Sequence, residues 1–163
     1  MTVLVTGGAG YIGGHTVHQL VDQGERVVVL DNLSTGQRSQ IQSGVPCIIG
    51  DAGDVGLVYR VIKSYGVESV MHFAGSIKVE ESVLDPLKYY RNNVDVSRTV
   101  LEAAVAGGVK HFVFSSSAAV YGNPVQVPVP ESAPEQPTSP YGWSKVMTEV
   151  MLRDATEAHG LRN

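Results

Sequence analysis

Short apolar runs alternate with longer segments of helical period along most of the chain. The apolar runs occupy 2–6, 26–30, 45–49, 69–73 and 111–115. Most are rich in valine or isoleucine and lack apolar–polar alternation, which is typical of strands buried on both faces of a parallel sheet. We therefore expect about five parallel strands.

The segments between these runs predict helices, because their apolar residues recur every three or four positions. In the first, Ile12, Thr16 and Leu20 share one stripe and Gly24 is a plausible stop. The predicted helices span 11–23, 54–65, 86–106 and 141–159. This alternation predicts an α/β fold, a Rossmann-like three-layer sandwich with an open parallel sheet in the order 3-2-1-4-5.

Composition narrows the classes of function. The chain has 163 residues, 43% hydrophobic and 17% charged, which suits one globular domain. The net charge is -4 and no basic run appears, so no nucleic-acid partner is expected. No metal site is predicted either.

The amino terminus and the cysteine count indicate the compartment. The run "MTVLVTGG" reaches glycine too early for a signal peptide or a membrane span. The one cysteine, Cys47, cannot form an internal disulfide and is expected to be a buried strand residue. We therefore expect a soluble protein of a reducing, cytoplasmic compartment with no membrane partner.

A glycine-rich loop lies between the first strand and the first helix. The stretch "VTGGAGYIGGH" places Gly7, Gly10 and Gly13 there, where glycines let the backbone turn sharply and approach a diphosphate. The helix amino terminus offers free N–H groups and a partial positive charge to that anion. In this context the loop predicts dinucleotide binding, although glycines also simply make turns.

An acid follows at the end of the next strand. Asp31 lies where a carboxylate accepts hydrogen bonds from the adenosine ribose hydroxyls, which favours NAD over NADP. It can equally cap a turn, and the two roles are compatible. Later strand ends fit the same plan: Asp51 near the adenine, and Phe73, Ala74 and Gly75 as nucleotide-lining groups.

The stretch "SPYGWSK" places Tyr141 and Lys145 one helical turn apart, on one face of a starting helix. A neighbouring lysine cation stabilises a phenolate, and such a phenolate can remove a proton from a substrate hydroxyl. Ser117, in "FSSSAAVYG", could hold the substrate oxygen. Taken singly, the pair could be a solvated surface contact and the serines a strand-end cap. Together with the glycine loop and Asp31, they favour catalysis.

The whole pattern resembles the extended short-chain dehydrogenase/reductase family and, within it, the sugar-nucleotide 4-epimerases. The matching stretches are "VLVTGGAGYIG", "LDNLSTG", "GDAGD", "HFAG", "ESVLDPLKYYRNNV", "FSSSAAVYG" and "SPYGWSK". The resemblance implies a tightly held NAD that accepts hydride from C4 of a UDP-hexose. A 4-keto sugar then rotates and is reduced on its other face, which interconverts UDP-glucose and UDP-galactose.

The resemblance also implies residue roles. Tyr141 would be the proton acceptor, Lys145 its partner and a contact of the nicotinamide ribose, and Ser117 a sugar contact. The residues expected to line NAD are Tyr11, Ile12, Asp31, Asn32, Asp51, Ala52, Phe73, Ala74, Gly75, Asn92, Tyr141 and Lys145, together with Gly7, Gly10 and Gly13. Relatives commonly form homodimers through the helices that correspond to 86–106 and 141–159.

The chain departs from the family pattern in two places. Ile77 stands where many relatives carry a lysine near the cofactor phosphate, and Lys78 follows it. Relatives are roughly twice as long, so residues 1–163 are expected to be an incomplete NAD-binding domain without the substrate domain, with the fifth strand as an open edge.

Two rival functions remain. One is a sugar-nucleotide 4,6-dehydratase, although Ala118 and Ala119 stand where that chemistry wants an acid pair. The other is a non-catalytic dinucleotide-binding module whose role is association with a partner chain.

Overall fold

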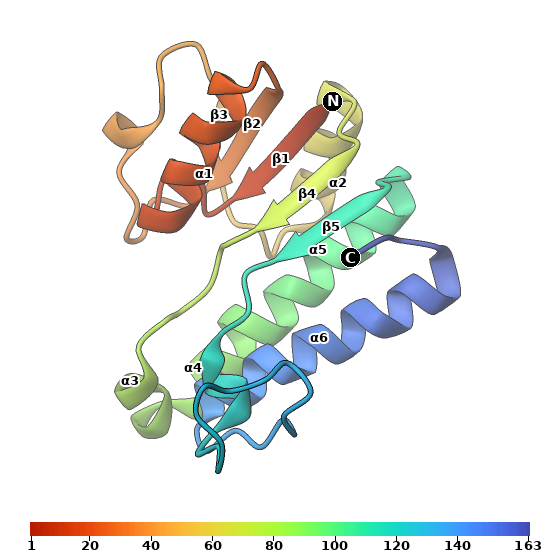
Figure 1. Cartoon of the computed structure of the whole chain (residues 1–163). Coiled ribbons are helices and arrows are strands. Elements are labelled where there is room, and N and C mark those ends of the chain that lie inside the picture. The colour runs from red at the N-terminus through yellow and green to blue at the C-terminus, as the bar shows by residue number, and fades with distance from the viewer.

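The computed structural model describes residues 1–163 and contains one parallel sheet, as the sequence predicts (Figure 1). Its strands are β1 (Thr2–Thr6), β2 (Arg26–Asp31), β3 (Cys47–Ile49), β4 (Ser69–His72) and β5 (His111–Phe114). The order is β3-β2-β1-β4-β5, and every neighbouring pair is parallel. The expected strand order is therefore confirmed, with β3 two residues shorter than predicted.

Four long helices connect and cover the strands: α1 (Tyr11–Asp22), α2 (Val55–Tyr65), α5 (Val96–Gly107) and α6 (Pro140–His159). Local signals set several ends. The Asp54 side chain caps α2 by accepting from the Leu57 N–H at 2.9 Å, and Gly66 ends it with a φ of 58°. The Ser139 hydroxyl caps α6 in the same way.

The prediction of a single helix over 86–106 is wrong in detail. The structure has three consecutive helical elements there: α4 (Pro86–Tyr89), a π-helical segment (Tyr90–Asp95) and α5. A further short helix, α3 (Val79–Leu84), precedes them. The spacing of apolar residues alone does not predict the wider turns of the π-helical segment. That segment carries asparagine side chains that bond to a loop earlier in the chain. Two 3₁₀ turns, Arg38–Gln40 and Ala118–Tyr121, complete the structure.

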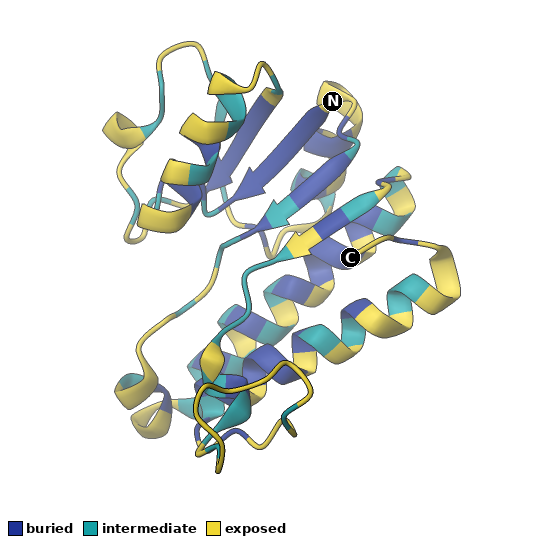
Figure 2. Ribbon diagram, in the orientation of Figure 1, coloured by how far each residue is buried: buried dark blue, intermediate teal, exposed yellow.

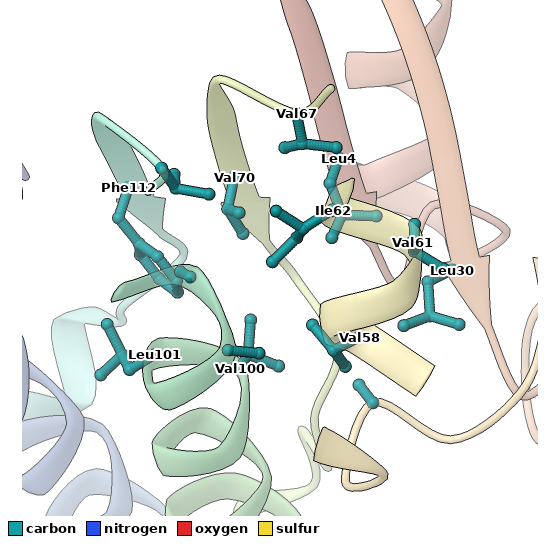
Figure 3. Close-up of a cluster of buried hydrophobic side chains, with 14 of the residues drawn as sticks. Leu4, Leu30, Val58, Val61, Ile62, Val67, Val70, Val100, Leu101 and Phe112 are labelled. Carbon is teal, nitrogen blue, oxygen red and sulfur yellow. The ribbon is translucent and has the colours of Figure 1, made fainter. Parts of the chain in front are cut away.

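The larger core lies between the sheet and helices α2, α5 and α6. Figure 3 shows Leu4, Val70 and Phe112 of the strands facing Ile62 and Val100 of the helices, and all five side chains are nearly or fully inaccessible. A smaller cluster on the opposite face packs α1 against β1 and β2. Helices therefore lie on both faces, which confirms the three-layer sandwich.

The outer strands are less buried than the sequence predicts (Figure 2). Cys47 of β3 is half-buried, and Val113 of β5 is 47% exposed. The reason is coverage, because α1 packs against β1 and β2 and leaves β5 largely uncovered on that face. No helix of the structure combines the length and the apolar character that a membrane crossing requires.

The outer edge of β5 is not fully open, contrary to expectation. The Phe112 N–H donates to the Arg162 carbonyl at 2.8 Å, and the Arg162 N–H donates to the Lys110 carbonyl at 3.0 Å. The bridge is parallel, and the neighbouring Leu161 is buried. The last residues of the chain thus lie in the position of a sixth parallel strand.

Candidate functional site

The glycine loop turns directly from β1 into α1. Gly7 has a φ of 71°, and a Cβ there would lie 2.6 Å from the Ala74 backbone nitrogen. A Cβ on Gly13 would lie 2.3 Å from the Gly7 carbonyl oxygen. These positions require glycine, because any side chain would collide with backbone. Gly10 precedes α1 and no side chain caps the helix, so its first N–H groups have neither an intrahelical partner nor a side-chain cap.

Asp31 ties the end of β2 to this loop. Its carboxylate accepts from the Ala9 N–H at 2.9 Å and from the Leu33 N–H at 2.8 Å. Both oxygens retain a lone pair for a further donor. Asp31 therefore acts as a turn-forming residue in this structure, and its carboxylate also remains able to accept from a ribose hydroxyl. Asn32 forms its own turn by accepting from the Ser34 N–H.

The residues expected near the adenine lie beyond β3. Asp51 is exposed and accepts from the Gly53 N–H at 2.7 Å, whereas Ala52 is buried in the larger core. Tyr11 and Ile12 at the start of α1 are 80% and 58% exposed. Exposed apolar groups beside free helix N–H groups leave an accessible surface for a ligand.

The segment after β4 lies against the glycine loop. Phe73 packs in the smaller core, and the Ala74 backbone contacts Gly7. Gly75 lies next to Asn93, whose Oδ1 would be 3.1 Å from a Cβ at that position. Ile77, at the position of the expected lysine, is 73% exposed. The Lys78 N–H donates to the Tyr89 hydroxyl at 3.0 Å.

Two asparagines in the π-helical segment connect this loop with α6. The Asn92 amide donates to the Ser76 hydroxyl at 3.1 Å. Asn93 accepts from the Ser76 N–H at 2.7 Å and donates to the Ser76 carbonyl and to the Ser144 hydroxyl, both at 3.0 Å. Asn93 therefore links the loop beside the glycines to the helix that carries the tyrosine and the lysine.

Tyr141 and Lys145 lie on one buried face of α6, as predicted, and are 9% and 6% exposed. The Lys145 Nζ is 5.7 Å from the centre of the Tyr141 ring and 4.7 Å from that of Phe114. It donates to the Ser115 carbonyl at 2.9 Å. Burial lowers the pKa of Lys145 to about 8, and the nearby Glu149 opposes that shift. The solvated surface pair is thereby excluded.

Tyr141 is held from a second side as well. The Tyr89 ring meets it edge to face at 6.4 Å, and the Tyr141 N–H donates to the buried Ser82 hydroxyl at 3.2 Å. Its ring orientation therefore depends on α3 and α4 as well as on α6.

The three serines after β5 have three different partners. The Ser115 carbonyl accepts from Lys145, and the Ser116 hydroxyl donates to the Glu149 carboxylate. The Ser117 hydroxyl accepts from the Ala119 N–H at 3.2 Å, so Ser117 caps the 3₁₀ turn. No hydrogen bond joins Ser117 to Tyr141 or Lys145. Ser117 thus retains its hydroxyl proton for a ligand while also serving as the strand-end cap.

Sequence reasoning missed several residues that organise this site. Asn93, Ser76 and Ser144 form the link between the loops, and Ser116 with Glu149 braces the end of β5. The paired asparagines and the position of Glu149 one turn beyond Lys145 were the available signals. Neither signal predicts which residue forms the hydrogen bond, because the bonded residues lie far apart in the chain.

Known proteins resemble this chain over nearly its whole length. Residues 3–163 match the NAD dependent epimerase/dehydratase family. The UDP-glucose 4-epimerase of Azospirillum brasilense is 56% identical over 161 residues, which are 99% of this chain and 46% of that protein. That of Halalkalibacterium halodurans is 47% identical over 162 residues, 99% of this chain and 48% of that protein.

Solved structures agree in fold. The UDP-glucose 4-epimerase of Brucella ovis in complex with NAD has a TM-score of 0.96 and 43% identity, over 99% of this chain and 49% of that one. That of Thermotoga maritima with UDP-glucose has a TM-score of 0.94 and 37% identity, over 99% of this chain and 53% of that one.

The chain belongs to the NAD dependent epimerase/dehydratase family. More narrowly, it is a homologue of UDP-glucose 4-epimerases, and it spans about half the length of the curated relatives it matches.

Proposed function

We propose that this chain carries the NAD-binding and proton-transfer half of a UDP-glucose 4-epimerase. The observation that carries the proposal is the Asn93 link, which joins the glycine-loop region to the helix bearing Tyr141 and Lys145. A cofactor on the glycines and a sugar at the tyrosine would then lie in adjacent spaces. Similarity to UDP-glucose 4-epimerases over the whole chain supports the substrate.

The residues of the chain fit the cofactor. The uncapped N–H groups at the start of α1 would bind the pyrophosphate, and Gly7, Gly10 and Gly13 carry no side chain that would obstruct it. Asp31 would accept from the adenosine ribose, and Asn92 and Lys145 would approach the nicotinamide end. When bound, NAD supplies a hydride acceptor at the sugar C4.

Tyr141 would accept the proton of the sugar 4-hydroxyl as the C4–H bond breaks, which yields a 4-keto sugar. Lys145, held near the phenol by the Ser115 carbonyl, would stabilise the negative charge on the phenolate. Ser117 would orient the sugar oxygen by donating its free hydroxyl proton. Return of the proton from Tyr141, with hydride on the opposite face, would invert the C4 centre.

The dehydratase alternative has less support. Ala118 and Ala119 form the first residues of the 3₁₀ turn and bring no acid to this position. An acid and a base near the sugar C5 and C6 would be needed for loss of water. The non-catalytic binding module differs from the enzyme only in turnover, so it is an outcome of the experiment below.

The proposal is tested by calorimetric titration with NAD and by a coupled assay with UDP-galactose. The assay uses this chain beside the same chain extended at its carboxyl end to the length of its relatives. Tyr141→Phe should abolish turnover and leave NAD affinity unchanged, whereas Tyr65→Phe, at the far end of α2, should change neither.

Each outcome has one meaning. Absence of NAD binding by the parent chain removes the cofactor assignment. Full turnover by Tyr141→Phe removes the proposed base. NAD binding without turnover in either length favours the binding module.

We further propose that two copies associate through α5 and α6. A groove of about 610 Å³ runs between these helices and includes Leu101, Val105 and Met151. A second copy would cover it. Sedimentation of the parent should give a dimer, and Ala155→Arg, which places a charge in the groove, should give a monomer. A parent that sediments as a monomer would contradict this assembly.

A further inference from the structure

Glu149 lies one helical turn beyond Lys145 and two turns beyond Tyr141 on α6. All three project from the same side of the helix, because residues four apart share a face. The expected chemistry uses the tyrosine and the lysine but assigns nothing to the glutamate. Its side chain is half-buried, unlike the exposed Glu157 two turns further along the same helix.

The Glu149 carboxylate is held in place by the segment that follows β5. The Ser116 hydroxyl donates to its Oε1, and the two residues are 33 positions apart in the chain. The preceding residue, Ser115, holds the Lys145 ammonium through its carbonyl. One short segment after β5 therefore holds both residues: the Ser116 side chain holds the Glu149 carboxylate, and the Ser115 backbone carbonyl holds the Lys145 ammonium.

Lys145 has few other charged neighbours. On its own helix the titratable groups near it are Tyr141 and Glu149, and on β4 the nearby group is His72. Burial lowers the pKa of His72 to about 3, so its ring is neutral at ordinary pH. Phe114 and Ser115 of the β5 segment carry no charge. Glu149 is thus the one anion that favours the protonated form of Lys145.

We propose that Glu149, held by Ser116, is a positioning residue whose carboxylate, one helical turn away, favours the charged form of the Lys145 ammonium beside Tyr141. The inference rests on the proposed function, because it concerns the partner of the proposed base. It is nevertheless tested on the chain alone, without NAD or sugar.

Two substitutions separate charge from hydrogen bonding. Glu149→Gln removes the charge and retains an amide oxygen that can accept from Ser116. Ser116→Ala retains the charge and removes the donor that holds it. If Glu149 serves only to fasten α6 to the segment after β5, Glu149→Gln should leave the titration of Lys145 unchanged. Glu157→Gln is the matched control, since it removes an exposed carboxylate from the same helix.

The measurement follows the titration of Lys145 by NMR with isotope-labelled lysine, its signal assigned by its absence from Lys145→Arg. The parent should titrate near the pKa of about 8. In Glu149→Gln the neutral fraction of Lys145 at neutral pH should rise roughly threefold, as expected for the loss of a half-buried anion about one turn away. Ser116→Ala should give a smaller rise, and Glu157→Gln none.

A titration of Lys145 in Glu149→Gln that coincides with the parent would overturn the proposal. Circular dichroism first establishes that each variant folds. If Glu149→Gln does not fold, Glu149→Met, which also removes the charge, is titrated instead, and a Lys145 titration that coincides with the parent in that variant overturns the proposal. NAD binding by the parent is measured separately, so failure of the cofactor assignment and failure of this inference give different results.

Discussion

Acidification from about pH 7 to about pH 5 should destabilise the folded chain through one buried histidine. His72 ends β4, is 1% exposed and bonds to two hydroxyls. Its Nδ1 lies 2.6 Å from the Thr6 Oγ1 and its Nε2 lies 2.9 Å from the Ser97 Oγ. Burial, followed by the Lys145 cation, lowers its pKa from 6.5 to about 3.

The direction and size of the effect follow from that difference. Between the two values the unfolded chain binds a proton that the folded chain lacks, so stability falls as pH falls. The contribution is fully present above the unfolded pKa of 6.5 and decreases through the window down to about 3. Each pH unit within it costs about 1.4 kcal/mol, and most of the interval from pH 7 to 5 lies inside it. We expect a loss of about 2 kcal/mol in the free energy of unfolding.

Urea unfolding followed by circular dichroism at the two pH values measures this loss. His72→Gln should be less stable than the parent at both pH values. The loss in its free energy of unfolding between pH 7 and pH 5 should be about 2 kcal/mol smaller than in the parent. His15→Gln, on the exposed surface of α1, should keep the parental difference. NMR of the His72 ring should show no protonation above pH 5 in the folded parent. A His72→Gln difference equal to that of the parent, or a ring that titrates near its ordinary value, would refute the reasoning.

Three further predictions concern the loop, a cap and the link between the loops. Gly7→Ala should lower the free energy of unfolding by at least about 1–3 kcal/mol in urea unfolding and abolish calorimetric NAD binding, because its φ is 71° and its Cβ would strike Ala74. Asp54→Ala should cost about 1 kcal/mol by the same unfolding measurement without reducing NAD affinity, because it only caps α2. Asn93→Ala should cost about 1–3 kcal/mol and weaken NAD binding, because a buried amide that bonds to Ser144 is lost; unchanged affinity would show that the link is dispensable.

Much of the fold could be predicted because its signals are local. Apolar runs mark the strands, and the left-handed glycines Gly66 and Gly108 end α2 and α5 where the periodicity stops. The glycine loop and Asp31 could be predicted from the sequence, because the turn between β1 and α1 requires glycine at fixed positions and the acid follows at the end of the next strand. The helical spacing of Tyr141 and Lys145 likewise placed both on one face, as the structure confirms.

The rest depended on partners that no local pattern names. The exposure of Val113 follows from where α1 packs, and the pairing of Arg162 with β5 follows from how α6 returns to the sheet. The wider turn before α5 accompanies bonds from asparagines to a loop that precedes them by 16 or 17 positions.

The sequence by itself determined the class of fold, the strand order and the residue types available for chemistry, since periodicity and turn geometry act over a few residues. Only the tertiary structure decided which serine meets the lysine, which meets the glutamate and which caps a turn. Buried polar groups must find partners wherever the packed elements place them, and that requirement is satisfied in space rather than along the chain.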